Sequence, residues 1–337
     1  MEAAWPDVSI VFLAFNRRDA LATSLEHVLE QLDYPPEHLE VIVVDNASTD
    51  GTAELVSERF GSVRLIRNPE NVGASGWNVG MSTARGEWRL ILDDDCHISG
   101  DALKVAVRRA EEHGADFVSF RVLSGLVHGY AFTEEYRTGL LDFWGCSAMF
   151  SRRVIETEPF YDPALFMWAN EMELTMRLLD RGFRHLYLPE VESIHMAGPN
   201  PAFDERKYRT NYRHWGYIVG KHLRPRDAAG ALGNLLLHPL VTAAGRDPRA
   251  LKALVDGPRG FARGVRARAP VRASVSHVYR RHTRQFASPL PLLRRPLARV
   301  GDNRAPERVE AARRSRNEGW YARHDPYYPT GPGTLEL

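Results

Sequence analysis

Short apolar runs alternate with segments of helical periodicity over the first hundred residues, and this alternation restricts the fold more than any other feature of the chain. The strand-like runs are Val8–Phe15, Leu39–Val44, Val63–Arg67 and Trp88–Leu92, and the helix-like segments between them are 21–32, 52–60 and 74–84. Strands joined by single helices form right-handed crossovers, which place the strands parallel in one sheet. The pattern therefore predicts an α/β fold with a mostly parallel sheet.

The character of the chain changes after Pro199, where strand signals end and arginine and proline become frequent. Before this point we expect helices at 101–113 and 170–180, strands at 116–121, 145–150, 185–188 and 191–195, and a substrate-facing loop at 122–142. Beyond it, 208–222 and 227–244 have helical spacing. The sequence thus predicts two domains, one at 1–200 that contains the sheet and a basic, mainly helical one at 201–337.

Polar residues follow the expected strands at their carboxyl ends. Asn16 and Arg17 follow the first strand, Asp45 the second, Asn68 the third, and the triplet 93–95 the fourth. Open parallel sheets bind ligands beyond these ends of their strands. The sequence therefore places a ligand site at this edge of the sheet.

The triplet consists of three consecutive aspartates after an apolar strand. Like charges at this spacing raise one another's pKa values, and a divalent cation with oxygen ligands removes that cost. In an extended segment Asp93 and Asp95 project to the same side, whereas Asp94 points elsewhere, toward a ribose hydroxyl. The alternative is a solvated turn, in which aspartate is also common. We interpret the triplet as a site for Mg²⁺ or Mn²⁺, where the cation would neutralise a diphosphate.

The sequence offers no competing phosphate-binding loop. It contains neither G-x-x-x-x-G-K-[ST] nor G-x-G-x-x-G, because the glycines at 73, 76 and 80 are spaced differently. Kinase and dehydrogenase functions are therefore disfavoured, and we expect a metal to hold the phosphates.

Three motifs occur in order: V-V-D-N-A-S-T-D-G-T at 43–52, N-V-G-A-S-G-W-N-V-G at 71–80 and L-D-D-D at 92–95. In these motifs the chain resembles family 2 glycosyltransferases over about residues 7–222, and the second motif looks most like that of the rhamnosyl- and galactofuranosyltransferase branch. The resemblance implies a glycosyltransferase A-type fold with a Rossmann-like sheet, a metal-binding D-x-D motif and sugar transfer with inversion at the anomeric carbon.

The resemblance also implies a set of donor-binding residues. Phe15, Asn16 and Arg17 would border the nucleobase, Asp45 would hydrogen-bond a uracil or thymine base or the ribose, and Asn71, Gly73 and Asn78 would line the diphosphate and ribose, with Asp93 and Asp94 beside them and Trp144, Gly145 and Cys146 below the donor sugar. Asp45 has an alternative role as a helix cap, for which Ser48 and Asp50 are better placed. The glycines have an alternative role in tight turns and close packing.

An inverting transfer needs a general base that takes the proton of the acceptor hydroxyl. The acidic motif of the family matches W-A-N-E-M-E-L-T-M-R at 168–177, where Asn170 replaces the first acid and Glu171 stands at the aspartate. We expect Glu171 to be the base. Glu173 remains the alternative, because the glutamate at 171 is one methylene longer than the aspartate of the family. Ordinary enrichment of acids in the first turn of a helix would also explain both.

His195 ends an expected strand after this helix. The resemblance makes it a third metal ligand beside Asp93 and Asp95, and imidazole binds Mn²⁺ together with carboxylates. A lone histidine is more often structural. Trp168 would either stack on a sugar face or belong to the core.

The charge is distributed unevenly along the chain. Residues 1–200 contain 17 Lys and Arg against 32 Asp and Glu, whereas residues 201–337 contain 27 against 11. The basic region either packs on the acidic half, which we favour, or rests on an anionic membrane face and meets a lipid-linked acceptor. No nucleic-acid-binding module is recognisable, so nucleic acid is not an expected partner.

The two cysteines, Cys96 and Cys146, are too few for a disulfide framework or a cysteine-based zinc site. The first residues lack the features of a signal peptide, and no run of about 18 apolar residues occurs. We therefore expect a cytoplasmic protein, with a peripheral contact on the inner face of the membrane left open. Homo-oligomer formation is compatible with these features.

Together these features predict a metal-dependent inverting glycosyltransferase (a hexosyltransferase) that uses a UDP- or TDP-sugar donor. The acceptor would be a hydroxyl of a glycan, a lipid-linked molecule or a small molecule, in glycan or glycoconjugate biosynthesis. One alternative is a sugar-1-phosphate nucleotidyltransferase, which would need a glycine-rich loop after the first strand that 15–19 does not provide. The other is a non-catalytic sugar-nucleotide-binding protein.

Overall fold

The computed structural model describes residues 5–124, 134–136, 141–157, 159–196, 204–245, 247–287 and 333–335. The strands are β1 (Val8–Ala14), β2 (Leu39–Asp45), β3 (Arg64–Arg67), β4 (Trp88–Asp93), β5 (Cys96–His97), β6 (Phe117–Ser124), β7 (Glu134–Tyr136), β8 (Ser147–Ser151), β9 (His185–His195) and β10 (Gly333–Leu335). The helices are α1 (Arg18–Gln31), α2 (Thr52–Arg59), α3 (Trp77–Thr83), α4 (Ala102–Glu112), α5 (Arg152–Thr157), α6 (Asn170–Asp180), α7 (Glu205–His222), α8 (Pro225–Gly245), α9 (Ala253–Arg266) and α10 (Ala273–Ala287). Single 3₁₀ turns lie at 36–38, 73–76 and 248–252.

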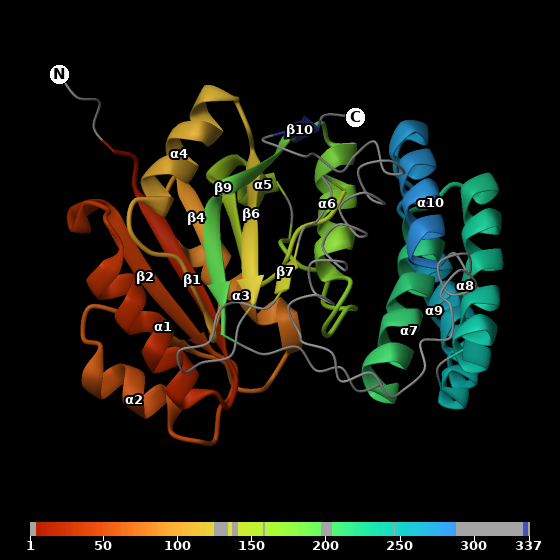
Figure 1. Ribbon diagram of the computed structural model, residues 1–337, viewed down its shortest axis with the longest axis horizontal. Coiled ribbons are helices and arrows are strands. Elements are labelled where there is room, and N and C mark those ends of the chain that lie inside the picture. The colour runs from red at the N-terminus through yellow and green to blue at the C-terminus, as the bar shows by residue number, and fades with distance from the viewer. Residues whose placement is uncertain are drawn as a thin grey trace, which may run out of the picture. The chain divides into compact units, whose positions relative to one another are not determined.

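The chain divides into two compact units. The first contains all the strands together with α1 to α6, and the second contains α7 to α10 (Figure 1). In the first unit the sheet has the order β10-β9-β6-β8-β4-β1-β2-β3, with β5 paired to β9 and β7 paired to β6. This is the predicted α/β architecture with a helical C-terminal region.

The sheet is parallel on one side of β4 and mixed on the other. Strands β3, β2, β1 and β4 run parallel, as the alternation of strands and helices predicts. Strand β8 then pairs antiparallel with both β4 and β6. Because β8 runs against β4, its first residue Ser147 lies opposite Leu92, near the end of β4. This topology brings the residues before β8 next to the acidic triplet.

Helix α3 approaches the sheet closely because two glycines of the second motif, Gly76 just before the helix and Gly80 within it, face the sheet. A Cβ at Gly76 would lie 2.5 Å from the side chain of Leu13, and one at Gly80 would lie 2.4 Å from that of Val11. Both distances are too short for real side chains. These two glycines therefore serve helix–sheet packing, as the structural alternative for the motif predicts.

The core of the first unit lies where apolar faces of the helices meet the sheet. Leu21 and Leu25 of α1 and Leu103 and Val107 of α4 are fully buried against residues of the strands such as Phe12. The recurrence of these residues every three or four positions explains why α1 and α4 were predictable.

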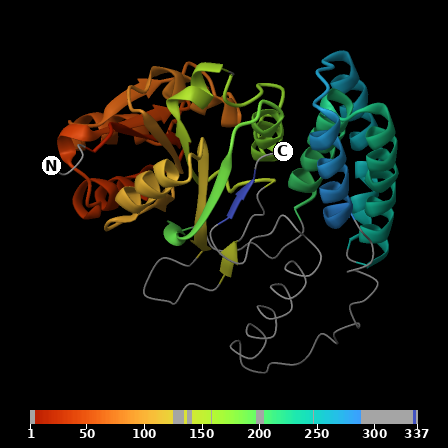
Figure 2. The same ribbon diagram turned by 90° about the horizontal axis from the view of Figure 1, so that it is seen from above.

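In the second unit, α7 and α9 pack with their backbones almost in contact. A Cβ at Gly216 would lie 2.0 Å from the carbonyl oxygen of Gly257, and one at Gly260 would lie 1.9 Å from that of Arg213. The buried carboxylate of Asp256 on α9 accepts hydrogen bonds from Arg209 and Arg213 of α7, each at 2.7 Å. Figure 2 shows α7 to α10 side by side. No helix in the described ranges is long and apolar enough to cross a membrane.

Several elements differ from the predictions. The two strands expected at 185–188 and 191–195 form the single strand β9, whose pairing with β6 skips residues 189–191. The expected loop at 122–142 contains the end of β6 and all of β7, and residues 125–133 and 137–140 lie outside the described residues. Strand β10 shows that strands do not end at Pro199. Strands this short carry too few residues to show a period. Helices α5, α9 and α10 were not predicted.

Candidate functional site

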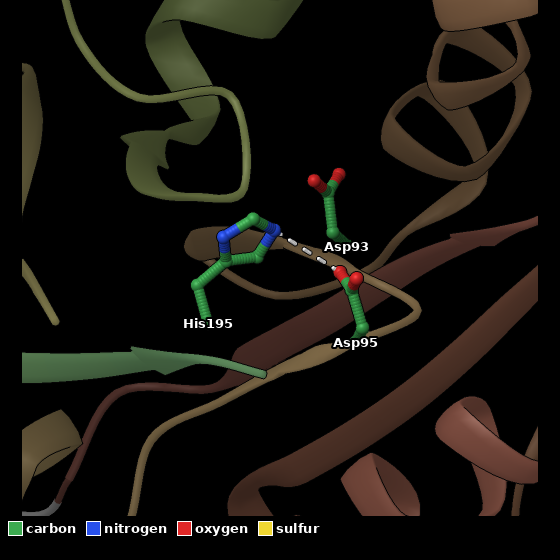
Figure 3. A group of neighbouring side chains, drawn as sticks. All are labelled: Asp93, Asp95 and His195. Atoms are coloured by element: carbon green, nitrogen blue, oxygen red, sulfur yellow. Dashed lines mark ion pairs between the residues drawn. The ribbon is translucent and has the colours of Figure 1, made fainter. Parts of the chain in front are cut away.

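The acidic triplet lies at the carboxyl end of β4, where the chain turns into β5. Strand β5 pairs antiparallel with the end of β9, so that Cys96 lies opposite His195. This pairing brings the His195 Nε2 atom within 3.3 Å of Asp95 Oδ1. One ligand atom each from Asp93, Asp95 and His195 lies within 4.8 Å of the others, and Figure 3 shows the three side chains converging. The structure thus brings together the three residues that were predicted as metal ligands.

The electrostatics of this cluster fit a cation. Burial, followed by the charge of Asp95, raises the pKa of Asp93 to about 6. Burial and the charges of Asp93 and Asp95 raise the pKa of Asp94 to about 8. Burial would also raise the pKa of Asp95, but the hydrogen bond and charge of His195 and the charge of Arg17 hold it below its usual range. A divalent cation between two carboxylates and an imidazole would offset the burial and the mutual repulsion that raise the pKa values of Asp93 and Asp94.

Arg17 points to the acidic triplet. Its Nη1 donates a hydrogen bond to Asp95, and its Nε lies 3.9 Å from Asp94 Oδ1. The backbone N–H of Phe15 donates to Asp94 at 3.3 Å. The loop after β1 is therefore tied to the triplet by Arg17 and Phe15, a connection that the prediction of a nucleobase border did not anticipate.

The loop after β2 also contacts the loop after β1. The backbone N–H of Asn16 donates to Ser48 at 3.0 Å, and Asn16 Oδ1 accepts from the Thr49 N–H at 2.7 Å. Asp45 is buried and accepts from the Ser48 N–H at 3.3 Å. Asp50 accepts from the N–H of Thr52, the first residue of α2, at 3.1 Å. Asp50 thus accepts the hydrogen bond at the start of α2, the capping role for which Asp45 was predicted to be the weaker candidate.

Asn46 organises the segment between β3 and α3, a role that sequence reasoning missed. Its Nδ2 donates to Asn71 Oδ1 at 2.9 Å and to the Gly73 carbonyl at 3.1 Å. Its Oδ1 accepts from Asn68 at 3.1 Å and from the Val72 N–H at 3.3 Å. Only its position directly after a buried strand and Asp45 marked it in the sequence. Asn71 therefore acts in this structure as a hydrogen-bond partner of Asn46.

Gly73 serves a close approach of two backbones. It has a φ of +64°, and a Cβ at this position would lie 2.0 Å from the carbonyl oxygen of Phe166. The N–H of the next residue, Ala74, donates to the same carbonyl at 2.7 Å. The structure thus gives Gly73 the packing role that was the alternative to donor contact.

Asn78 holds the segment that precedes α6. Its Nδ2 donates to the carbonyl of Tyr161 at 2.8 Å, and its Oδ1 accepts from the Tyr161 N–H at 2.7 Å. Both ends of the side-chain amide are therefore engaged by one residue. This contact differs from the predicted donor contact and makes Asn78 a positioning residue.

Glu171 lies in the first turn of α6, after two residues with left-handed backbones, Trp168 (φ +67°) and Ala169 (φ +62°). Its carboxylate lies against Gly145, where a Cβ would be 2.1 Å from Glu171 Oε1. Burial, with a smaller contribution from Asp93, raises the pKa of Glu171 to about 7. A carboxyl group with this pKa can take a proton near neutral pH.

Two further groups, Asp142 and Tyr161, interact electrostatically with Glu171 and were not predicted. Burial and the charge of Glu171 raise the pKa of Asp142 well above its usual range. The hydroxyl of Tyr161 is buried and has no hydrogen-bond partner among the described residues. Burial raises its pKa, with contributions from Glu171, Asp93 and Asp142. No sequence motif marks either residue, because both reach Glu171 only through the tertiary fold.

Glu173 is fully buried and has a different partner. It accepts a hydrogen bond from Arg177 Nε at 2.8 Å, and Arg177 also donates to the carbonyls of Pro159 and Phe160 at 3.0 and 2.7 Å. The pair therefore holds the segment before α6. This arrangement favours Glu171 over Glu173 as the base.

The loop before β8 carries the residues that were predicted below the donor sugar. Trp144 is exposed, and the Cys146 carbonyl accepts from the Asp93 N–H at 3.1 Å. Cys146 is a free, buried thiol, as is Cys96. Trp168 is half-buried, so neither interpretation of this residue is decided.

The chain resembles known proteins in its sequence. Residues 9–144 match the model of glycosyl transferase family 2. A succinoglycan biosynthesis protein (ExoO) of Rhizobium meliloti is 38% identical over 112 residues, which are 33% of this chain and 31% of that protein. The chain thus spans about a third of the length of this relative.

Two solved structures share the fold. The mannosyltransferase of Pyrobaculum calidifontis, in complex with GDP-Man and Mn²⁺, has a TM-score of 0.52 at 20% identity and covers 96% of this chain and 83% of its own. Residues 1–349 of S. aureus TarS, in complex with UDP, have a TM-score of 0.50 at 16% identity and cover 82% of this chain and 92% of their own. Residues 9–144 therefore form a family 2 glycosyltransferase domain, and the first unit has the glycosyltransferase A-type fold.

Proposed function

We propose that the protein is an inverting glycosyltransferase that moves a sugar from a nucleoside diphosphate to an acceptor hydroxyl. The observation that carries the proposal is the carboxyl group of Glu171 in the first turn of α6, which lies against Gly145 and whose pKa desolvation and the charge of Asp93 raise to about 7. A base at this place can remove the proton of an attacking hydroxyl while the triplet side of the site holds the diphosphate.

The donor set of Asp93, Asp95 and His195 fits Mn²⁺ or Mg²⁺, since it offers two carboxylates and one imidazole with ligand atoms within 4.8 Å of one another. When bound, such a cation would supply positive charge that stabilises a departing diphosphate. The mannosyltransferase of Pyrobaculum calidifontis was solved with Mn²⁺, which supports this assignment.

Side chains of the protein bind the diphosphate and the sugar and accept the proton. Arg17, beside Asp94 and Asp95, supplies a second positive charge for the diphosphate when the carboxylates are occupied. Trp144 offers an exposed ring next to Gly145, suited to a sugar face. Glu171 accepts the proton from the acceptor hydroxyl. We keep UDP- and TDP-sugars as the proposed donors, and GDP-sugars enter the test because of the GDP-Man complex.

Acceptor-free donor hydrolysis tests the proposal without knowledge of the acceptor. The protein is incubated with UDP-, TDP- and GDP-sugars and Mn²⁺, and proton NMR follows the anomer that is first released. We expect one donor to release sugar with an inverted anomeric centre. Release with retained configuration would refute inversion.

Two further assays separate the alternatives. A nucleotidyltransferase would release pyrophosphate from a nucleoside triphosphate and a sugar 1-phosphate. A binding protein would be stabilised by a donor yet show no turnover, and Glu171→Gln would leave it unchanged. We expect neither result, because Glu171 has the pKa of a working base.

A further inference from the structure

Helix α8 exposes a continuous apolar face. From the second turn onward, the exposed positions of α8 recur every three or four residues and lie on one side of the helix. We call this side the leucine face. It consists of Ala229, Gly233, Leu236, Leu237, Leu240 and Ala244. The three leucines keep 44%, 45% and 47% of their surface exposed. No charged residue occurs from 228 to 245. Such a face on a surface helix marks a contact with a partner.

The opposite side of α8 is already used for packing inside the second unit. Leu235 is buried and lies 3.8 Å from a Cβ built at Gly257 of α9. Gly230 lies at the edge of the leucine face, on the helical line of Leu237, and contacts the side chain of Arg280 of α10. Because Leu235 fixes the orientation of the helix, the leucine face points away from α9, and Arg280 of α10 lies at the edge of the face.

The second unit is strongly basic, which narrows the choice of partner. Residues 204–280 contain 16 Lys and Arg against 5 Asp and Glu. The acids are engaged within the unit: Asp204 with the Lys207 N–H, Glu205 with Lys252, Asp227 with Ser276, Asp247 with Arg249, and Asp256 with Arg209 and Arg213. The surface charge therefore comes from basic side chains, and an anionic partner is favoured.

Exposed arginines of the second unit can contact an anionic partner. Arg226 continues the line of the leucine face at the start of α8, and Arg259 and Arg266 are exposed on α9. None of the three forms an ion pair with another described residue. Their guanidinium groups are suited to phosphate oxygens.

A second copy of the chain fits this face less well than a lipid surface. Three leucines that are less than half exposed offer far less than the roughly 800 Å² per partner of a standard protein interface. Two copies of the second unit would also repel each other through their like charge. A bilayer with anionic headgroups satisfies both the apolar face and the charge.

We propose that the leucine face of α8 lies on the surface of a bilayer that contains anionic lipids, with the leucines at the boundary of headgroups and acyl chains. The contact is peripheral, since within the described part of the chain no helix can span a membrane. The proposal concerns the second unit alone and does not depend on the proposed activity of the first.

Vesicle flotation of the full chain tests the proposal. We expect the protein to float with vesicles of phosphatidylglycerol and phosphatidylcholine, to bind vesicles of phosphatidylcholine alone much less, and to be released in part by about 0.5 M salt. The triple variant Leu236→Gln, Leu237→Gln, Leu240→Gln should lose about tenfold or more in partitioning. Leu29→Gln, which changes a leucine that is 38% exposed on α1, is the matched control and should bind as the unchanged protein does.

A fluorescent probe tests the location of the contact. Leu237→Cys is labelled with nitrobenzoxadiazole, because the native Cys96 and Cys146 are buried. Anionic vesicles should raise the emission and shift it to shorter wavelength, whereas the same label at Leu29→Cys should not respond. Absent flotation, unchanged flotation of the triple variant or a silent probe at 237 would overturn the proposal. Sedimentation that shows a dimer broken by the triple variant, without vesicle binding, would assign the face to a second copy instead.

Discussion

The side-chain amide of Asn78 pairs with the backbone of Tyr161 as a peptide group would, donating to its carbonyl at 2.8 Å and accepting from its N–H at 2.7 Å. Tyr161 follows Phe160, whose carbonyl accepts from Arg177. The segment before α6 is therefore held at two points, by α3 and by α6 itself. The buried hydroxyl of Tyr161 and the carboxyl of Glu171 interact electrostatically at this place. We therefore expect this asparagine of the second motif to position the segment beside the proposed base.

Asn78→Ala should lower both stability and turnover. The substitution leaves the carbonyl and the N–H of Tyr161 without their partner, which costs about 1–3 kcal/mol of unfolding free energy for part-buried groups. We expect kcat to fall more than the donor KM rises, because the base moves while the acidic triplet stays. Denaturant unfolding and donor hydrolysis measure the two effects. Ser82→Ala, on the exposed side of the same helix, is the control and should change neither; an Asn78→Ala protein with unchanged kcat would contradict the positioning role.

Turnover should depend on pH through Glu171. A base must be deprotonated, and burial raises the pKa of Glu171 to about 7, so kcat should fall about tenfold per pH unit below that value and level off above it. Glu171→Gln should lose about 10²- to 10⁴-fold in kcat, because an amide cannot accept the proton. Its donor affinity should stay within a few-fold of the unchanged protein. Measurement of kcat against pH and of donor binding by calorimetry checks both.

Glu173→Gln should act mainly on stability. Breaking the buried pair of Glu173 and Arg177 leaves a guanidinium without its anion, at a cost of about 3–5 kcal/mol. The pH at which kcat is half-maximal should stay near that of the unchanged protein. If Glu173→Gln moved this midpoint while Glu171→Gln did not, the base would have to be reassigned.

Metal-free protein should become less stable as pH rises from about 4 to about 8. The folded state keeps the protons of Asp93 and Asp94 up to pKa values of about 6 and about 8, whereas unfolded carboxyls lose theirs near about 4. The folded state binds more protons over this range, so the free energy of unfolding falls with pH. Thermal unfolding measures the slope, and Asp94→Asn should flatten it.

Mn²⁺ should reverse this loss. We expect it to raise Tm more at about pH 8 than at about pH 5, because protons compete with the cation for the carboxylates at the lower pH. A chelator should abolish the shift, and so should Asp95→Ala. A Tm shift that persists in Asp95→Ala would place the metal elsewhere.

Two glycine-to-alanine changes in the second unit should have opposite signs. Gly260→Ala places a Cβ 1.9 Å from the Arg213 carbonyl oxygen and should cost about 1–3 kcal/mol, since α7 and α9 must separate. Gly233→Ala meets no atom within 4 Å and should gain about 0.5–1 kcal/mol from helix propensity. Denaturant unfolding of both variants measures the difference. A loss of similar size in both would exclude close packing as the reason.

The sequence predicted the elements whose apolar residues follow a regular pattern. Buried runs such as 39–44 and 88–92 marked β2 and β4, and the polar residues after them marked the edge where Asp93 lies. The convergence of His195 on Asp95 depends on the two-residue strand β5, which is too short to show any period. The resemblance to a family predicted His195 where periodicity could not.

The roles of individual polar residues were less predictable. Asn46, Asn78 and Gly73 stand in recognisable motifs, but their partners come from backbone groups far along the chain. Asp142 and Tyr161 carry no motif, and only their electrostatic interaction with Glu171 in the folded chain reveals them. A sequence pattern identifies which residue types gather at a site, whereas the hydrogen-bond partner of each depends on tertiary contacts.

The contact between Gly145 and Glu171 links two segments that are separate in the sequence. Because a Cβ at 145 would meet the carboxylate at 2.1 Å, a larger residue there must either displace the Glu171 side chain or be matched by a shorter acid at 171. Aspartate at 171 would make that room by removing one methylene. Libraries that diversify the loop before β8 to alter sugar choice should therefore vary both positions jointly, since randomising either alone would yield mostly inactive clones.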